Sequence, residues 1–170
     1  MVEERGSDRD GNADREGHTG QSPSDRHIER TFELAREAVA DGNTPFGSLL
    51  VVDGEVVRES RNTTRSDDDV TAHPELKLAR WAARELNDEE LDRCTMYTST
   101  EPCPMCASAI VYAGLDRVVF AVRGRTLANL SDGVIDIPCE AVVRRSGGDT
   151  AVEGPVNEAA GMRVHETFFG

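Results

Sequence analysis

Two short stretches of the sequence bring together residue types that bind a transition metal. TAHPELKLAR contains His73 and Glu75, and STEPCPMCASAI contains Cys103 and Cys106. A catalytic zinc ion takes three protein ligands, mostly thiolates and imidazoles, and leaves its fourth position to water. His73, Cys103 and Cys106 supply that number of ligands. Glu75 is close enough in sequence to reach the water without being a ligand, so the pattern predicts a zinc site that makes hydroxide near neutral pH.

Each stretch opens a predicted helix. Pro74 suits a first helical turn, and leucines and alanines at spacings of three and four give the segment that follows an apolar stripe. The predicted strand RCTMYTST then leads through EPCP into a second helix, MCASAIVYAG. Because a helix N-terminus stabilises negative charge, Cys103 and Cys106 at its start are favoured as thiolates.

Taken alone, each half of the pattern has other interpretations. A CxxC pair fits thiol redox chemistry, metal binding or coincidence, although a thioredoxin-like pair would follow a strand near the start of its domain. A structural zinc site would need a fourth ligand, and neither Cys94, Cys139 nor His165 has chelating spacing. We expect Cys94 and Cys139, which lie in apolar runs, to be structural residues. A zinc-stabilised binding domain without activity is a further alternative, but it would have no use for Glu75 at the open coordination position.

The length and composition predict one domain that follows a disordered N-terminal tail. At 170 residues the chain is long enough for one domain with a real core. Residues 1–25 have almost nothing to bury and predict a disordered acidic tail, and residues 26–170 form the domain. The sequence has neither an apolar run of membrane-spanning length nor a signal-peptide core, so we expect a cytoplasmic protein.

The formal net charge is −13, from 32 acidic and 19 basic residues, and Lys77 is the only lysine. This balance disfavours a nucleic-acid partner, because phosphate contacts need clustered Lys or Arg. It also resembles proteins of a high-salt cytoplasm, in which the Debye length falls to about 3 Å at 1 M salt and self-repulsion is screened. The acidity therefore predicts a halophilic protein and weakens, without removing, the case against RNA.

The remaining elements indicate an α/β fold. A helix with Ser24 or Asp25 as its N-cap ends at Gly42, and two strands follow that join at Asp53-Gly54, a dipeptide typical of hairpins. DRVVFAV predicts a fourth strand, RGRTLANLSDG a loop or short helix, AVVRRSGG a helix, AVEGPV a short strand and NEAAGMRVHETFF a final helix. Strands that alternate with helices after one hairpin predict a layered α/β domain.

An H-x-E motif at the start of one helix and P-C-x-x-C at the start of the next, with one strand between them, form a specific combination. It resembles the zinc-dependent cytidine and deoxycytidylate deaminase superfamily. The resemblance covers about residues 28–135, and it departs at Pro74, where many members have alanine. It implies three zinc ligands and a glutamate that shuttles protons: His73, Cys103 and Cys106, with Glu75 as the glutamate.

The same resemblance assigns two residues to substrate binding. Asn62 stands eleven positions before His73, which is the spacing of the family's base-binding asparagine, although an Asn at the end of a strand also suits a turn. Phe46, in PFG, resembles the ring that lines the family's base pocket, and it equally fits a core position.

Within the superfamily, YTSTEPCPMCASAI and PFGSLLV look most like the guanine deaminase and tRNA adenosine deaminase branch. That branch implies a three-layer α/β/α sandwich around a five-stranded mixed sheet, usually as a homodimer. tRNA adenosine deaminases typically have an Asp-Pro-Lys-like segment where this chain has VRGRTLANLSDG, which favours a free guanine-like base or its nucleoside here. Deamination of the tRNA wobble adenosine and of cytosine or cytidine are the alternatives. Asp132, in LSDG, is the best match to a substrate-contacting aspartate, although an Asp-Gly turn is the simpler interpretation.

Overall fold

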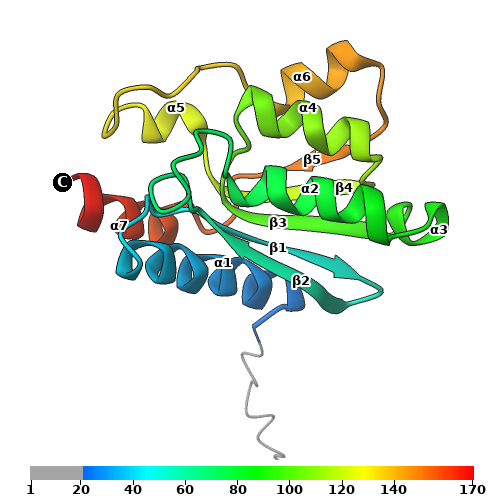
Figure 1. Ribbon diagram of the computed structural model, residues 1–170, viewed down its shortest axis with the longest axis horizontal. Coiled ribbons are helices and arrows are strands. Elements are labelled where there is room, and N and C mark those ends of the chain that lie inside the picture. Colours follow the sequence, from blue (N-terminus) through cyan, green and yellow to red (C-terminus); the bar gives the residue numbers. More distant parts are fainter. Residues whose placement is uncertain (1–20) are drawn as a thin grey trace, which may run out of the picture.

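A computed structural model describes residues 21–170, which fold around one five-stranded sheet (Figure 1). The strand order is β2-β1-β3-β4-β5. β1 pairs antiparallel with β2 and with β3, whereas β4 pairs parallel with β3 and with β5. The strands are β1 Gly47–Val52, β2 Glu55–Arg61, β3 Cys94–Thr100, β4 Arg117–Val122 and β5 Ala151–Glu153.

Helices cover both faces of the sheet. In Figure 1, α2, α4 and α6 lie on one side and α1 and α7 on the other, which confirms the predicted three-layer sandwich with a mixed sheet. The helices are α1 Pro23–Ala40, α2 Pro74–Glu85, α3 Asp88–Leu91, α4 Pro104–Ala113, α5 Gly124–Leu127, α6 Cys139–Ser146 and α7 Glu158–Phe169. Among the described residues, no helix is long and apolar enough to cross a membrane.

The first hairpin forms at the predicted dipeptide. Asp53 and Gly54 both have positive φ, 51° and 84°, which is the backbone that a tight two-residue turn needs. Val52 and Glu55 pair directly across the turn. All six residues of β1 are buried, while β2 is the exposed edge of the sheet.

Each face of the sheet has its own core. The α2, α4 and α6 side is filled by residues such as Leu50, Met96 and Ile110, and it includes Cys94 and Cys139, which are buried as expected for structural cysteines. The α1 and α7 side is filled by a separate cluster, in which α1, β4 and α7 contribute Ile28, Phe32, Val119, Val122 and Val164.

One boundary differs from the sequence prediction, and one short helix, α3, was not predicted. The N-cap of α1 is Ser22, and not Ser24 or Asp25, because Ser22 Oγ accepts from the backbone N–H of Asp25 while Asp25 Oδ2 accepts from the N–H of Ser22. Pro23 fits the first helical position of this capping box. The end of the predicted tail therefore belongs to α1, and residues 1–20 of that tail lie outside the described part. The four-residue helix α3 is too short to show a periodic pattern.

Candidate active site

The three predicted metal ligands converge at one end of the sheet. His73 Nδ1 lies 3.8 Å from Cys103 Sγ and 3.6 Å from Cys106 Sγ, and the three ligand atoms all lie within 4.8 Å of one another. Around a tetrahedral zinc ion, with bonds of about 2.0–2.3 Å, neighbouring ligand atoms stand roughly 3.3–3.8 Å apart. The donor set and its spacing therefore fit zinc.

Helix starts hold two of these ligands in place. His73 is the N-cap of α2 and Cys103 the N-cap of α4, and a proline occupies the first turn of each helix. Neither N-cap side chain makes a capping hydrogen bond. Their extended backbones thus leave both side chains free to point at a shared ion. Cys106, one turn into α4, completes the set from a fully buried position.

Hydrogen bonds among the ligands bias their protonation. The pKa of the Cys103 thiol is lowered to about 4, first because Cys106 donates to it and then because of His73. The same contact with Cys103, together with burial, raises the pKa of Cys106. The site is therefore ready to present at least one thiolate to a cation.

Glu75 lies beside the ligands in a nearly closed environment. It is 5% exposed, and burial raises the pKa of its carboxyl group above the ordinary value. Thr98 Oγ1 donates to Glu75 Oε1 at 2.8 Å, and Ser48 Oγ donates to Thr98 Oγ1 at 2.9 Å. This hydroxyl chain fixes the rotamer of Glu75 from the strands beneath it. A carboxyl group with a raised pKa holds a proton more readily than a free one, which suits a group that accepts and returns a proton in general acid–base catalysis.

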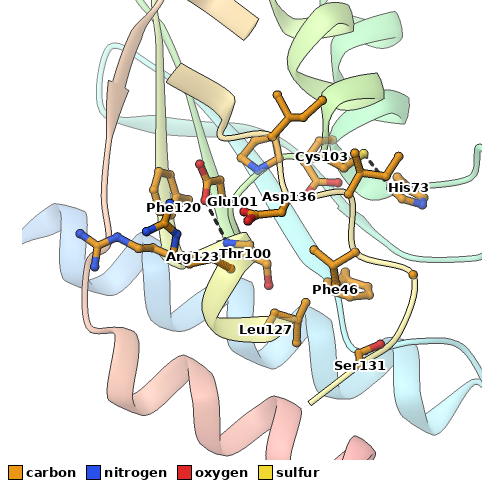
Figure 2. A pocket seen from close by; sticks show the side chains of 18 of the residues that line it. Phe46, His73, Thr100, Glu101, Cys103, Phe120, Arg123, Leu127, Ser131 and Asp136 are labelled. Carbon is orange, nitrogen blue, oxygen red and sulfur yellow. Dashed lines mark hydrogen bonds between the residues drawn. The ribbon is translucent and has the colours of Figure 1, made fainter. Parts of the chain in front are cut away.

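The ligands open into a cavity of about 860 Å³. His73, Glu75 and Cys103 line it together with Phe46, and the segment from residue 123 to residue 138 supplies much of the rest of the wall. Figure 2 shows the part of that segment with Ser131 and Asp136 passing beside Phe46 and Cys103. The volume lies within the range of about 300–1,000 Å³ that is usual for small-molecule sites.

Glu101 fastens this wall at both ends. Its Oε2 accepts from the N–H of Gly124 and its Oε1 from the N–H of Cys139, each at 2.9 Å. Because Glu101 precedes the ligand Cys103 by two residues, one carboxylate ties the cavity wall to the metal end of the site. The sequence prediction missed this role, since both partners are more than twenty residues away along the chain.

The three predicted substrate-binding residues lie in different settings. Phe46 and Asp132 both line the cavity. Asp132 is exposed and forms a turn with Gly133, whose φ is 90°. The structure therefore has both the Asp-Gly turn and a position of Asp132 at the cavity. Asn62 is 1% exposed and is not among the lining residues. Its Oδ1 accepts from the backbone N–H and the hydroxyl of Thr64, and its backbone N–H donates to the carbonyl of Phe46.

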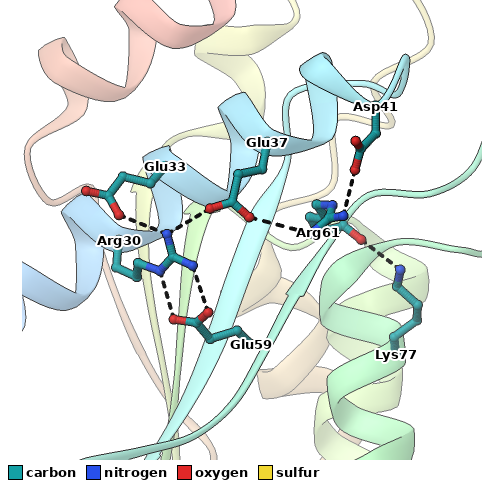
Figure 3. Close-up of polar contacts among 7 residues, drawn as sticks. All are labelled: Arg30, Glu33, Glu37, Asp41, Glu59, Arg61 and Lys77. Atoms are coloured by element: carbon teal, nitrogen blue, oxygen red, sulfur yellow. Dashed lines mark hydrogen bonds and ion pairs between the residues drawn. The ribbon is translucent and has the colours of Figure 1, made fainter.

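A polar network holds the segment that carries Asn62 (Figure 3). Lys77 Nζ donates to the carbonyl of Arg61 at 2.7 Å and to Thr63 Oγ1 at 2.8 Å. The guanidinium of Arg61 pairs with Asp41 at 2.6 Å. Lys77 thereby links α2, which carries Glu75, to the end of β2. In the sequence, the one sign that Lys77 has a particular role is that it is the only lysine of the chain.

The other candidates for a fourth ligand lie elsewhere. Within residues 21–170, the cluster that could hold a metal contains His73, Cys103 and Cys106 and not Cys94, Cys139 or His165. The arrangement has three protein ligands, as a catalytic zinc site does, and Glu75 stands beside them.

Comparison with known proteins identifies the pattern independently. Residues 21–122 match the cytidine and deoxycytidylate deaminase zinc-binding region. Guanine deaminase of Bacillus subtilis is 41% identical over 97 residues, which are 56% of this chain and 62% of that protein's length. The tRNA-specific adenosine deaminase of Agrobacterium fabrum is 38% identical over 107 residues, 63% of this chain and 70% of that protein. The structure of guanine deaminase from Nitrosomonas europaea has the same fold, with a TM-score of 0.75 at 20% identity over 86% of this chain and 84% of that one.

Proposed function

The chain belongs to the family defined by the cytidine and deoxycytidylate deaminase zinc-binding region, and from this premise we propose that it is a hydrolase that deaminates a purine base. Guanine or a close relative is the favoured substrate, and ammonia is the leaving product. The observation that carries the proposal is the buried Glu75 carboxyl group next to a three-ligand zinc site that opens into a cavity. A purely structural zinc site would gain nothing from such a carboxyl group, which argues against the alternative of an inactive binding domain.

His73, Cys103 and Cys106 would hold the zinc ion. When bound, zinc lowers the pKa of a water molecule to about 7 and so supplies hydroxide at neutral pH. Glu75 would accept a proton from the attacking water and pass it to a ring nitrogen of the base. It would then transfer the proton of the newly added hydroxyl group to the amine, which leaves as ammonia. Its raised pKa suits both the acceptance and the release of the proton.

The cavity walls would bind and orient the base. Phe46 would offer a ring face for stacking, and residues 123–138, which form much of the cavity wall, would limit the access of bulk water. Asn62 Oδ1 is bonded to Thr64, and its amide nitrogen makes no hydrogen bond to the described residues, so this nitrogen is the group that would donate to the base. Asp132 would accept from an amine of the ligand.

The choice of guanine rests on similarity and charge. The relative from Bacillus subtilis is named guanine deaminase, and a net charge of −13 with one lysine offers little to hold an RNA backbone. The Agrobacterium relative is a tRNA-specific adenosine deaminase, so the tRNA wobble adenosine is the second candidate. Cytosine or cytidine is the third.

The biological setting is part of the same proposal. We place the protein in the cytoplasm of a cell with high internal salt, where its acidic surface is screened. We also propose a homodimer, and Tyr112 on α4, which is 90% exposed, is an apolar group available for such an interface. Light scattering of the wild type and of Tyr112→Glu at molar salt tests this proposal, because a wild type that is monomeric at every concentration contradicts it.

The substrate is tested by competition in molar KCl. Guanine, guanosine, adenine, cytosine, cytidine and an anticodon stem-loop are offered to the zinc-loaded protein, and ammonia release is measured for each. Glu75→Gln is the matched control that keeps the ligands. We expect the highest kcat/KM for guanine. A much higher kcat/KM for the stem-loop would overturn the substrate assignment, whereas no ammonia from any compound would overturn the proposed enzyme.

A further inference from the structure

His165 reaches the active-site wall from α7, on the opposite face of the sheet from α2 and α4 (Figure 1). It is 1% exposed, and its Nε2 lies 2.8 Å from Thr100 Oγ1. The His165 ring also lies 5.4 Å from the ring of Phe46 and 6.3 Å from that of Phe169, measured between centroids. Thr100, Phe46 and Phe169 all line the cavity. His165 therefore supports the cavity from behind, although it falls outside the family match to residues 21–122.

The surroundings of His165 select one protonation state. Burial lowers its pKa to about 4, so the imidazole is neutral at pH 7, with one N–H and one acceptor nitrogen. Nδ1 is buried and has no hydrogen-bond partner among residues 21–170. A buried N–H without an acceptor is rarer in native proteins than a buried acceptor without a donor. The proton therefore belongs on Nε2, where Thr100 Oγ1 accepts it.

This assignment leaves the hydroxyl hydrogen of Thr100 for another acceptor. Thr98 and Thr100 are two positions apart on β3, so their side chains leave the strand on the same side. The hydroxyl of Thr98 donates to Glu75, whereas that of Thr100 still has its hydrogen to donate. The hydroxyl of Thr100 bonds to His165 and to no other described residue. Thr100 stands at the carboxyl end of β3, where the cavity begins. Figure 2 shows it between Glu101 and Leu127, which also line the cavity.

We propose that Thr100 is a substrate-binding residue whose hydroxyl donates a hydrogen bond to a ring nitrogen or carbonyl oxygen of the bound base, with His165 as the positioning residue that orients it. The proposal rests on the proposed base deamination and adds a contact to it. Purine bases offer such acceptors on several edges. A cavity that fixes the rotation of one hydroxyl can select among those edges at little entropic cost.

The test compares variants in zinc-loaded enzyme with the base that the wild type deaminates best. Thr100→Val keeps the shape and removes the hydroxyl, and Thr100→Ser restores it. His165→Phe keeps an aromatic ring between Phe46 and Phe169 and removes the donor. Thr167→Val, on the exposed side of α7, is the matched control.

We expect Thr100→Val to raise KM by about tenfold or more, the effect of one lost hydrogen bond, with unchanged zinc content. Thr100→Ser and Thr167→Val should stay within about threefold of the wild type. His165→Phe should raise KM in the wild-type background and add nothing in the Thr100→Val background, as a coupled pair does.

An active enzyme whose Thr100→Val variant keeps the wild-type KM overturns this assignment alone. A further rise in KM when His165→Phe is added to Thr100→Val overturns the positioning role. A zinc-loaded wild type that releases ammonia from no base overturns the proposed function and, with it, this contact.

Discussion

The buried, neutral His165 should make the protein lose stability as the pH falls. Its pKa is about 4 in the folded protein and 6.5 in an unfolded chain. Between these values the unfolded chain binds a proton at this imidazole and the folded protein does not. By linkage, the free energy of unfolding contributed by His165 is fully present above pH 6.5 and declines as the pH falls toward 4.

The size of the effect follows from the pKa difference, because each unit corresponds to about 1.4 kcal/mol. Between pH 7.5 and pH 5.0, His165 should cost the wild type about 2 kcal/mol of stability. The variant His165→Phe has no proton to bind at this position. It should therefore show a pH dependence shallower by that amount, even though its stability at pH 7.5 is lower through the lost bond to Thr100.

Urea unfolding of zinc-loaded wild type, His165→Phe and Thr167→Val at both pH values measures the difference, with ionic strength held constant. Carboxyl groups and metal ligands titrate equally in the three proteins and cancel in the comparison. Equal losses of stability in the wild type and in His165→Phe would show that His165 is not held neutral, and the argument for its tautomer would fail with it.

Three further outcomes are expected. Glu75→Gln should keep about one zinc ion per chain and lose about 10²–10⁴-fold in kcat; loss of the metal, or near-normal turnover, would contradict the proton-shuttling role. The melting temperature should rise from low to molar KCl, since salt screens the net charge of −13, and a flat or falling profile would contradict halophilic adaptation. Lys77→Met removes two hydrogen bonds to Arg61 and Thr63 and should reduce stability in urea by about 2 kcal/mol. Arg80→Met, at an exposed position of the same helix, should change stability by less than about 0.5 kcal/mol, and equal effects of the two substitutions would rule out a special role for Lys77.

Short-range patterns explain why much of the site could be predicted. His73 and Glu75 lie within one helical turn, and Cys103 and Cys106 within another. Each pair was therefore placed correctly as soon as its helix start was recognised from a proline and an apolar stripe. The hairpin was equally local, because Asp53-Gly54 carries its own turn geometry.

Contacts between distant residues explain what could not be predicted. His165 and Thr100 are 65 positions apart, and they meet because α7 packs against β4 and α1 beside the end of β3. Glu101 finds its partners through backbone N–H groups, which leave no trace in the identity of the residues that carry them. Residues 128–138, the part of the cavity wall that follows α5, show no periodic pattern of apolar residues. Their course along the cavity therefore depends on tertiary packing alone.

The central claim is that zinc at His73, Cys103 and Cys106 supports the release of ammonia from a base. The most direct test measures ammonia release from guanine by the protein as purified, after removal of the metal with a chelator, and after zinc is restored. The account predicts about one zinc per chain in the active protein, loss of activity with the metal, and recovery when zinc is added back. Full activity in protein shown by elemental analysis to be free of metal would contradict it.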